Sequence, residues 1–165
     1  MLKTLRTKMQ DDKGFTLIEL MVVVLIIAIL IAIAIPTFLG LRRRAQDRAA
    51  QSNLRNGFTA AKAFYTDCES WAPPATCGPT FNGATHGEAI EPSLTWVDGA
   101  LPAAPVVGSV YVTSVAAQVV VLEAESASGT TFCIAEDTSL GTVRGRDSAG
   151  GGFGTYALCN AALDW

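Results

Sequence analysis

An apolar segment near the N-terminus constrains this chain more than any other feature. Residues 15–41 contain one charged side chain, Glu19, and residues 20–35 form an unbroken apolar run. A helix over residues 15–41 would be about 40 Å long, against a hydrocarbon core of roughly 30 Å. Glu19 lies near one end, where an acidic residue costs less than the about 2.5–3.5 kcal/mol of a central position, and the apolar side chains outweigh it. The segment is therefore predicted to span a membrane as a helix.

The remainder of the chain has the composition of one soluble domain. The sequence has 165 residues, which is enough for a single domain and an appendage. From Ala63 onward there are eleven acidic residues and two basic ones, Arg144 and Arg146. Because nucleic-acid binding rests on clustered Lys and Arg, no nucleic acid is expected as a partner of this acidic domain.

Four cysteines indicate an oxidising compartment. They lack the Cys-x-x-Cys spacing of zinc sites, and His86 is the only histidine, so no metal site is predicted. An even count behind an export-like N-terminus favours two disulfides. Three connectivities are possible, and pairing within sequence neighbourhoods favours Cys68–Cys77 with Cys133–Cys159. The domain is then expected outside the cytoplasm, an orientation that the basic residues flanking the segment do not decide.

Two ordinary interpretations of the N-terminus have to be weighed. A secretory signal peptide could be cleaved after Ala32-Ile33-Ala34, but the apolar run exceeds the usual length of roughly 7–15 residues, and Pro36 follows too closely. An uncleaved membrane anchor would have the same composition. Neither explains a glutamate at the fifth position after a glycine.

The residues that lead into the apolar run resemble the class III signal of type IV prepilins and pseudopilins. They read Lys13-Gly14-Phe15-Thr16-Leu17-Ile18-Glu19-Leu20, and the likeness covers about residues 1–41. It implies that a prepilin peptidase removes residues 1–14 by cutting between Gly14 and Phe15, and then N-methylates Phe15. Glu19 would neutralise the Phe15 amine of a neighbouring subunit and set the register between apolar helices.

The resemblance also implies a function and its partners. The chain would be a structural subunit, not an enzyme, that moves from the cytoplasmic membrane, with its head outside, into a helical homopolymer at the cell surface. Its partners would be copies of itself, the prepilin peptidase, the inner-membrane pilus assembly platform, minor pilins and, before assembly, membrane lipid; no cofactor is expected. The alternatives are a pseudopilin of a secretion or DNA-uptake system and a monomeric membrane-tethered binding domain.

Residues 42–66 are predicted to continue the helix as an amphipathic half. Apolar side chains recur mostly at steps of three or four from Phe38 to Tyr65. Pro36 should kink or loosen the helix, and together with Glu19 it is a candidate assembly residue. Asn56-Gly57 suggests a bend. The Arg42-Arg43-Arg44 cluster is interpreted as a solvated helix face outside the membrane.

Residues 67–165 are predicted to form a head with a small antiparallel sheet, giving an α+β chain whose long helix packs on that sheet. Residues 68–105 show few regular elements. Strands are predicted at residues 110–113, 118–125, 130–135 and 155–159, with a turn at 126–129 and an exposed glycine-rich loop at 148–154. Val120, Leu122 and Ala124 should share one face of the sheet. Glu136-Asp137 are interpreted as solvated charge rather than as a cation site.

Overall fold

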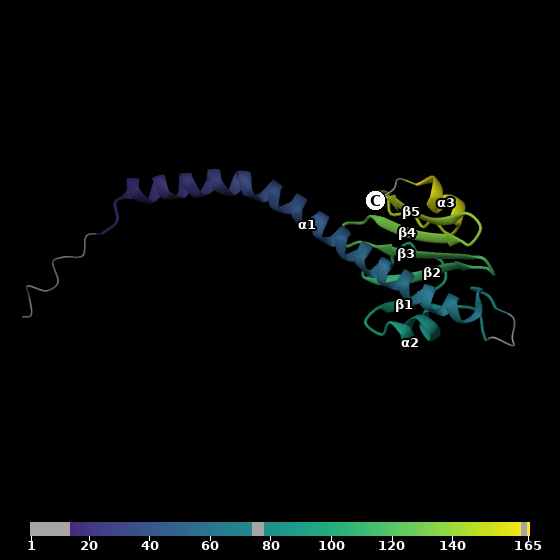
Figure 1. The fold of residues 1–165 in the computed structure, drawn as a ribbon. Coiled ribbons are helices and arrows are strands. Elements are labelled where there is room, and N and C mark those ends of the chain that lie inside the picture. The colour runs from purple at the N-terminus through teal and green to yellow at the C-terminus, as the bar shows by residue number, and fades with distance from the viewer. Residues whose placement is uncertain (1–13, 74–77, 163–164) are drawn as a thin grey trace, which may run out of the picture. The chain divides into compact units, whose positions relative to one another are not determined.

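One long helix runs through both compact units of the chain (Figure 1). The computed structural model describes residues 14–73, 78–162 and 165, and the division between the units falls between Leu41 and Arg42. The helix, α1 (Leu17–Cys68), supplies the end of the first unit and the beginning of the second. The long N-terminal helix predicted from the sequence is therefore confirmed.

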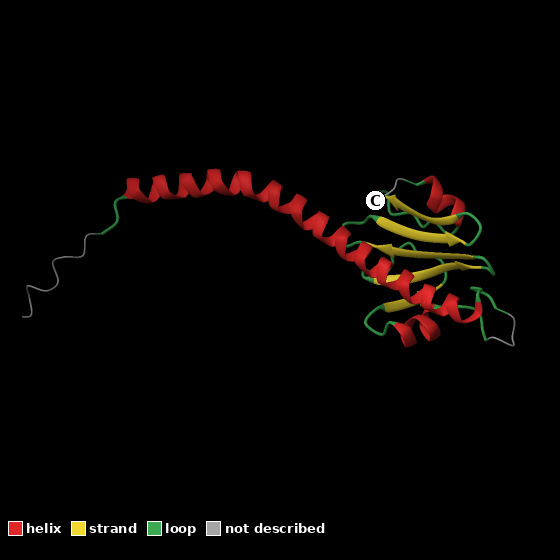
Figure 2. Ribbon diagram, viewed as in Figure 1, coloured by secondary structure: helices red, strands yellow, loops and turns green. Residues whose placement is uncertain are grey.

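The second unit contains a five-stranded sheet in the order β1-β2-β3-β4-β5 (Figure 2). The strands are β1 (Thr95–Asp98), β2 (Ser109–Val115), β3 (Val119–Glu125), β4 (Thr131–Asp137) and β5 (Gly141–Asp147). Strands β2 to β5 are antiparallel to their neighbours, whereas β1 pairs in parallel with β2. The predicted α+β fold with a mostly antiparallel sheet is confirmed.

One face of the sheet packs on the part of α1 that belongs to the second unit. Val120, Leu122 and Ala124 lie together in this core, as their alternation along β3 predicted. The helix meets the sheet with a mixture of small and large apolar side chains: Ala50, Leu54, Ala60, Ala61 and Phe64. The small side chains allow the helix backbone to approach the strands, and the large ones fill the space between them.

Gly57 lies at a close approach between α1 and the sheet. The helix runs without interruption through Asn56-Gly57. A Cβ at position 57 would lie 3.1 Å from Cγ1 of Val110 and 3.2 Å from Cη2 of Trp96. The glycine is therefore explained by packing, not by the bend that the sequence suggested.

An ion pair joins α1 to β4. The ammonium of Lys62 bonds Oε1 of Glu136, whose carboxylate is buried. The same ammonium lies 5.5–5.9 Å from the ring centroids of Phe58, Tyr65 and Trp71, a distance at which a cation is attracted to the ring face. The interpretation of Glu136 as solvated charge is wrong, because the helix brings a cation onto this residue.

Asp137, the next residue, is half-buried and closes the turn between β4 and β5. Its Oδ1 accepts hydrogen bonds from the hydroxyl and the N–H of Ser139 and from the N–H of Leu140. The hydroxyl of Ser139, followed by its N–H, holds the pKa of Asp137 below its usual value. The ionised carboxylate therefore serves as the cap of this hairpin.

The region after α1 is more regular than the sequence indicated. It contains a π-helical turn, η1 (Gly83–Gly87), the short helix α2 (Glu88–Ile90) and β1. Trp71 and Phe81 are buried in the core beneath α1, and Trp96 of β1 joins them. The prediction of mainly irregular structure at 68–105 missed these elements because each is only three to five residues long.

Two elements near the C-terminus differ from the predicted ones. The strand β5 was not predicted, and residues 156–159, predicted as part of a strand, belong to the helix α3 (Tyr156–Ala161). Thr155 starts this helix by accepting a hydrogen bond from the N–H of Leu158 at 3.2 Å. The predicted strand at 155–159 is therefore wrong, because a short apolar run does not distinguish a strand from a capped helix.

Replacement of Gly57 by leucine is expected to lower the free energy of unfolding by about 1–3 kcal/mol, since the new side chain would overlap Val110 and Trp96. Denaturant unfolding of the full chain in detergent, followed by tryptophan fluorescence, measures the change. Asn56→Leu places the same side chain at the exposed neighbouring position and should have little effect. Equal unfolding midpoints for the two variants would contradict the packing role of Gly57.

Candidate functional site

The bond between Gly14 and Phe15 lies ahead of the first helix. Because α1 begins at Leu17, residues 14–16 are outside it. A Cβ at position 14 would meet no other atom within 4 Å, and Phe15 is 85% exposed. Exposed, non-helical backbone of this kind is where proteases act. Lys13, which also belongs to the expected cleavage site, lies outside the described residues.

Thr16 and Glu19 form a reciprocal cap at the start of α1. The N–H and the hydroxyl of Thr16 donate to Oε2 of Glu19 at 2.9 Å and 2.7 Å, and the N–H of Glu19 donates to Oγ1 of Thr16 at 3.2 Å. This arrangement is the capping box, in which a threonine and a glutamate three residues later satisfy the open donors of a helix end. It also holds the one carboxylate of the apolar segment beside the Gly14–Phe15 bond.

The second carboxylate oxygen of Glu19 is open. Within the described part of the first unit, both hydrogen bonds from Thr16 go to Oε2 and none goes to Oε1. The side chain is exposed. Glu19 can therefore keep its own helix capped and accept one more donor from outside the chain.

The apolar half of α1 has no covering within its own unit. It is the one described helix that is long and apolar enough to cross a membrane, and none of that stretch is buried. Its large exposed apolar residues run from Phe15 to Leu41. A surface of this kind needs lipid or another apolar partner, because soluble proteins rarely leave such patches in water.

α1 continues through Pro36. The missing N–H of proline leaves the carbonyl of Ala32 without its usual donor. One residue further on, the hydroxyl of Thr37 donates to the carbonyl of Ile33 at 3.3 Å. This extra bond supports the backbone beside the proline, and the role of Pro36 in assembly stays a prediction.

Comparison with known proteins identifies the segment that carries these features. Residues 9–35 match the prokaryotic N-terminal methylation motif. The chain is also 46% identical over 61 residues to the type IV major pilin protein PilA of Myxococcus xanthus, in a match that covers 37% of this chain and 28% of that protein. This segment is that of a type IV pilin precursor.

Two pilins of Thermus thermophilus support the assignment. The type IV wide pilus major component PilA4 is 41% identical over 63 residues, covering 38% of this chain and 48% of that protein. The type IV narrow pilus major component PilA5 is 47% identical over 80 residues, covering 46% and 66%. The chain thus spans from about a quarter to two thirds of the length of these relatives. No solved structure is significantly similar to it.

The family consists of structural pilins and is not a family of enzymes. Pilins assemble with one another into pili, and the exposed apolar helix of this pilin suits both membrane anchoring and later packing against other helices.

Of the candidate residues, Gly14 and Phe15 directly precede α1 and Glu19 lies in its first turn. Sequence reasoning missed Thr16, which orients the Glu19 carboxylate. The spacing Thr-x-x-Glu directly before an apolar run was the signal that could have identified it.

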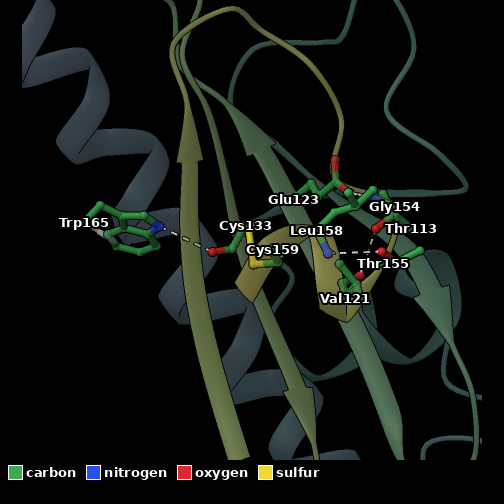
Figure 3. Close-up of a disulfide and its surroundings, with 9 residues drawn as sticks. All are labelled: Thr113, Val121, Glu123, Cys133, Gly154, Thr155, Leu158, Cys159 and Trp165. Atoms are coloured by element: carbon green, nitrogen blue, oxygen red, sulfur yellow. Dashed lines mark hydrogen bonds between the residues drawn. A yellow bond between two sulfur atoms is a disulfide. The ribbon is translucent and has the colours of Figure 1, made fainter. Parts of the chain in front are cut away.

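The pilin head is closed at its C-terminal end by a disulfide between Cys133 of β4 and Cys159 of α3 (Figure 3). This pairing is the one that the sequence neighbourhood favoured. The expected pairing of Cys68 with Cys77 falls on side chains outside the described residues. The disulfide holds α3 over the second face of the sheet, where Val121, Ala135 and Phe153 form a smaller core.

A glycine in β5 allows α3 to approach the sheet. A Cβ at Gly145 would lie 2.5 Å from the carbonyl oxygen of Cys159 and 2.9 Å from Sγ of Cys133. Glycine in a strand interior commonly marks such a contact. The same glycine lowers the β-propensity of residues 141–147, which explains why β5 was not predicted.

Two further contacts fasten the C-terminal segment (Figure 3). Oε1 of the buried Glu123 accepts the N–H of Gly154, so the glycine-rich loop is tied to β3. The indole N–H of Trp165 donates to the carbonyl of Cys133 at 3.3 Å, and the guanidinium of Arg55 lies 4.9 Å from the indole centroid. Both faces of the sheet are therefore covered by segments anchored through specific polar contacts.

Removal of the disulfide by the double substitution Cys133→Ala and Cys159→Ala should lower the free energy of unfolding of the head by about 2–5 kcal/mol, because α3 would lose its covalent link to β4. Chemical unfolding and limited proteolysis measure the loss. Non-reducing peptide mapping of the wild-type chain tests the pairing itself. Recovery of Cys133 linked to Cys68 or Cys77 would contradict it.

Proposed function

We propose that this pilin is cleaved after Gly14, N-methylated at Phe15 and polymerised through α1 into a surface filament. The Thr16–Glu19 cap carries the proposal, because it holds an open carboxylate oxygen at the end of an uncovered apolar helix. Cleavage would create an α-amine one residue before this cap. Unperturbed α-amines have a pKa of about 7.7–8.0, and an adjacent carboxylate favours the protonated form.

Pairing between the Glu19 of one copy and the Phe15 amine of another would fix how neighbouring helices are staggered. Smooth apolar surfaces can slide past one another, whereas a single polar pair selects one register. Phe15 precedes Glu19 by four residues. Bringing the two groups level would therefore displace the neighbouring helix along its axis.

A single-pass topology with the head outside the cytoplasm completes the proposal. The hydrophobic stretch of α1 is long enough to cross the bilayer, and the Cys133–Cys159 disulfide suits an oxidising compartment. The prepilin peptidase would then act on the cytoplasmic side, and an inner-membrane assembly platform with minor pilins would extract the subunit from lipid. Membrane lipid and further copies of the chain would cover α1 in turn.

A pseudopilin would be processed in the same way and would form a shorter polymer. In a monomeric anchored domain, neither the Phe15 amine nor the open oxygen of Glu19 would have a role. The relatives named above are major pilins or major pilus components, which favours the filament. Mass spectrometry should find a mature chain that starts at Phe15 with one added methyl group. An intact N-terminus, or one near Ile35, would refute the proposal.

Gly14→Val is expected to block removal of the leader, because a branched side chain would obstruct the peptidase at a position that is now open. Immunoblots of membrane fractions should show the precursor accumulating without filaments. Gly40→Val, at another glycine with no atom within 4 Å of its Cβ, is the matched control and should be processed normally. Normal maturation of the Gly14 variant would place the cleavage elsewhere.

Glu19→Gln and Glu19→Val separate the two tasks of this residue. Glutamine can still complete a capping box but cannot neutralise an amine, whereas valine does neither. Both variants should be cleaved and should stay in the membrane, and both should yield few surface filaments because a neighbouring amine would be left buried and unpaired. Filament yield after shearing, set against the processed pool in the membrane, measures the effect. Wild-type yield from the glutamine variant would refute the pairing role.

A further inference from the structure

The edge strand β5 carries two arginines on the face of the sheet that α1 covers. Arg144 lies opposite Ile134 of β4, and Arg146 lies opposite Phe132. Directly opposed residues of antiparallel strands share a face, and both Ile134 and Phe132 belong to the core beneath α1. The two arginines therefore lie on the α1 face of β5, and both are exposed.

Three more arginines lie along one side of α1. Arg44, Arg48 and Arg55 are spaced by four and seven residues, so they form a stripe on the helix. The guanidinium of Arg55 lies 4.9 Å from the indole centroid of Trp165, and that of Arg144 lies 5.8 Å from the same centroid (Figure 3). The stripe thus faces β5. We call these five residues the arginine flank: Arg44, Arg48, Arg55, Arg144 and Arg146.

No carboxylate neutralises the arginine flank within the part of the chain that the structure describes. The single ion pair there joins Lys62 to Glu136. Asp47 accepts the hydroxyl of Ser128 at 2.5 Å. Asp147 accepts two N–H groups of the glycine-rich loop, and as a strand neighbour of Arg146 it lies on the other face of β5. The flank is therefore a concentrated positive surface on a head that is otherwise acidic.

The lower end of the flank lies next to the membrane-spanning stretch. Arg44 follows Leu41, the last large apolar residue of that stretch, by three residues, or about 4.5 Å along a helix. Each headgroup layer is about 5–8 Å thick. When α1 crosses a bilayer, Arg44 is therefore among the headgroups, and the long side chain of Arg48 can reach them. Trp165 adds a half-buried indole, a side chain that favours the membrane–water interface.

We propose that the arginine flank binds the headgroups of anionic phospholipids, so that the head of a membrane-bound subunit rests on the bilayer with Trp165 at its surface. The proposal rests on the proposed anchoring of α1 and adds a lipid site on the head. Guanidinium groups bind phosphate through paired N–H donors. A cluster of them next to a membrane span is drawn to an anionic surface more strongly than to a zwitterionic one.

Quenching of tryptophan fluorescence tests the contact, with one full-length chain per lipid nanodisc. Trp71 and Trp96 are buried, whereas Trp165 is half-buried and lies within the flank. A fixed fraction of zwitterionic lipid with a spin label on its headgroup serves as the quencher. Quenching should be about twofold stronger in discs with about one third phosphatidylglycerol than in discs of phosphatidylcholine alone. Added salt should remove the difference, because it screens exposed charges.

Two double variants with the same loss of charge locate the contact. Arg48→Gln with Arg146→Gln should abolish the extra quenching in anionic discs. Arg42→Gln with Arg43→Gln removes two charges from the other sides of α1, even closer to the membrane span, and should retain it. The extra quenching should also disappear in Trp165→Phe.

Equal quenching of the wild-type chain in the two lipids would overturn the proposal. So would an equal loss in the two double variants, or quenching that persists in Trp165→Phe. Co-purification of the chain with the discs reports the anchoring of α1 separately. A chain that enters the discs and shows no dependence on anionic lipid would contradict the lipid site alone, whereas a chain that stays outside them would contradict the anchoring.

Discussion

The apolar surface of α1 between Leu17 and Leu41 is the constraint on which the rest depends. No described residue of its own unit covers it, and its one ionisable side chain is Glu19. A helix with this surface is stable only in lipid or against other apolar helices. The first unit therefore requires an apolar partner from outside its own chain.

Long-range periodicity made the large elements predictable from sequence. The apolar run and the apolar spacing of three or four residues that follows it predicted α1. The alternation of Val120, Leu122 and Ala124 predicted the buried face of β3. The match of residues 9–35 to the methylation motif was predictable because several residues have to agree in position at once. The hydrogen bonds of Thr16 were not foreseen, although their spacing was present in the sequence.

The elements that were missed depend on tertiary contacts. β5 contains two glycines and two arginines, and its residues form a strand because β4 pairs with it and α3 lies against Gly145. Residues 156–161 became a helix through the cap of Thr155 and the disulfide of Cys159. Glu136 was assigned to solvent because no local signal links it to Lys62, which is 74 positions away. In each case the deciding neighbour is distant in sequence.

The cap formed by Thr16 and Glu19 has a consequence for the reuse of subunits. All three of its hydrogen bonds lie within one chain, so they do not depend on whether that chain is alone in the bilayer or packed among others. A subunit that leaves a polymer would therefore return to lipid with its carboxylate already partly satisfied, and the barrier to withdrawal would be lower than for an unsupported charge. In the proposed polymer, a subunit would thus keep the same three hydrogen bonds before and after it joins.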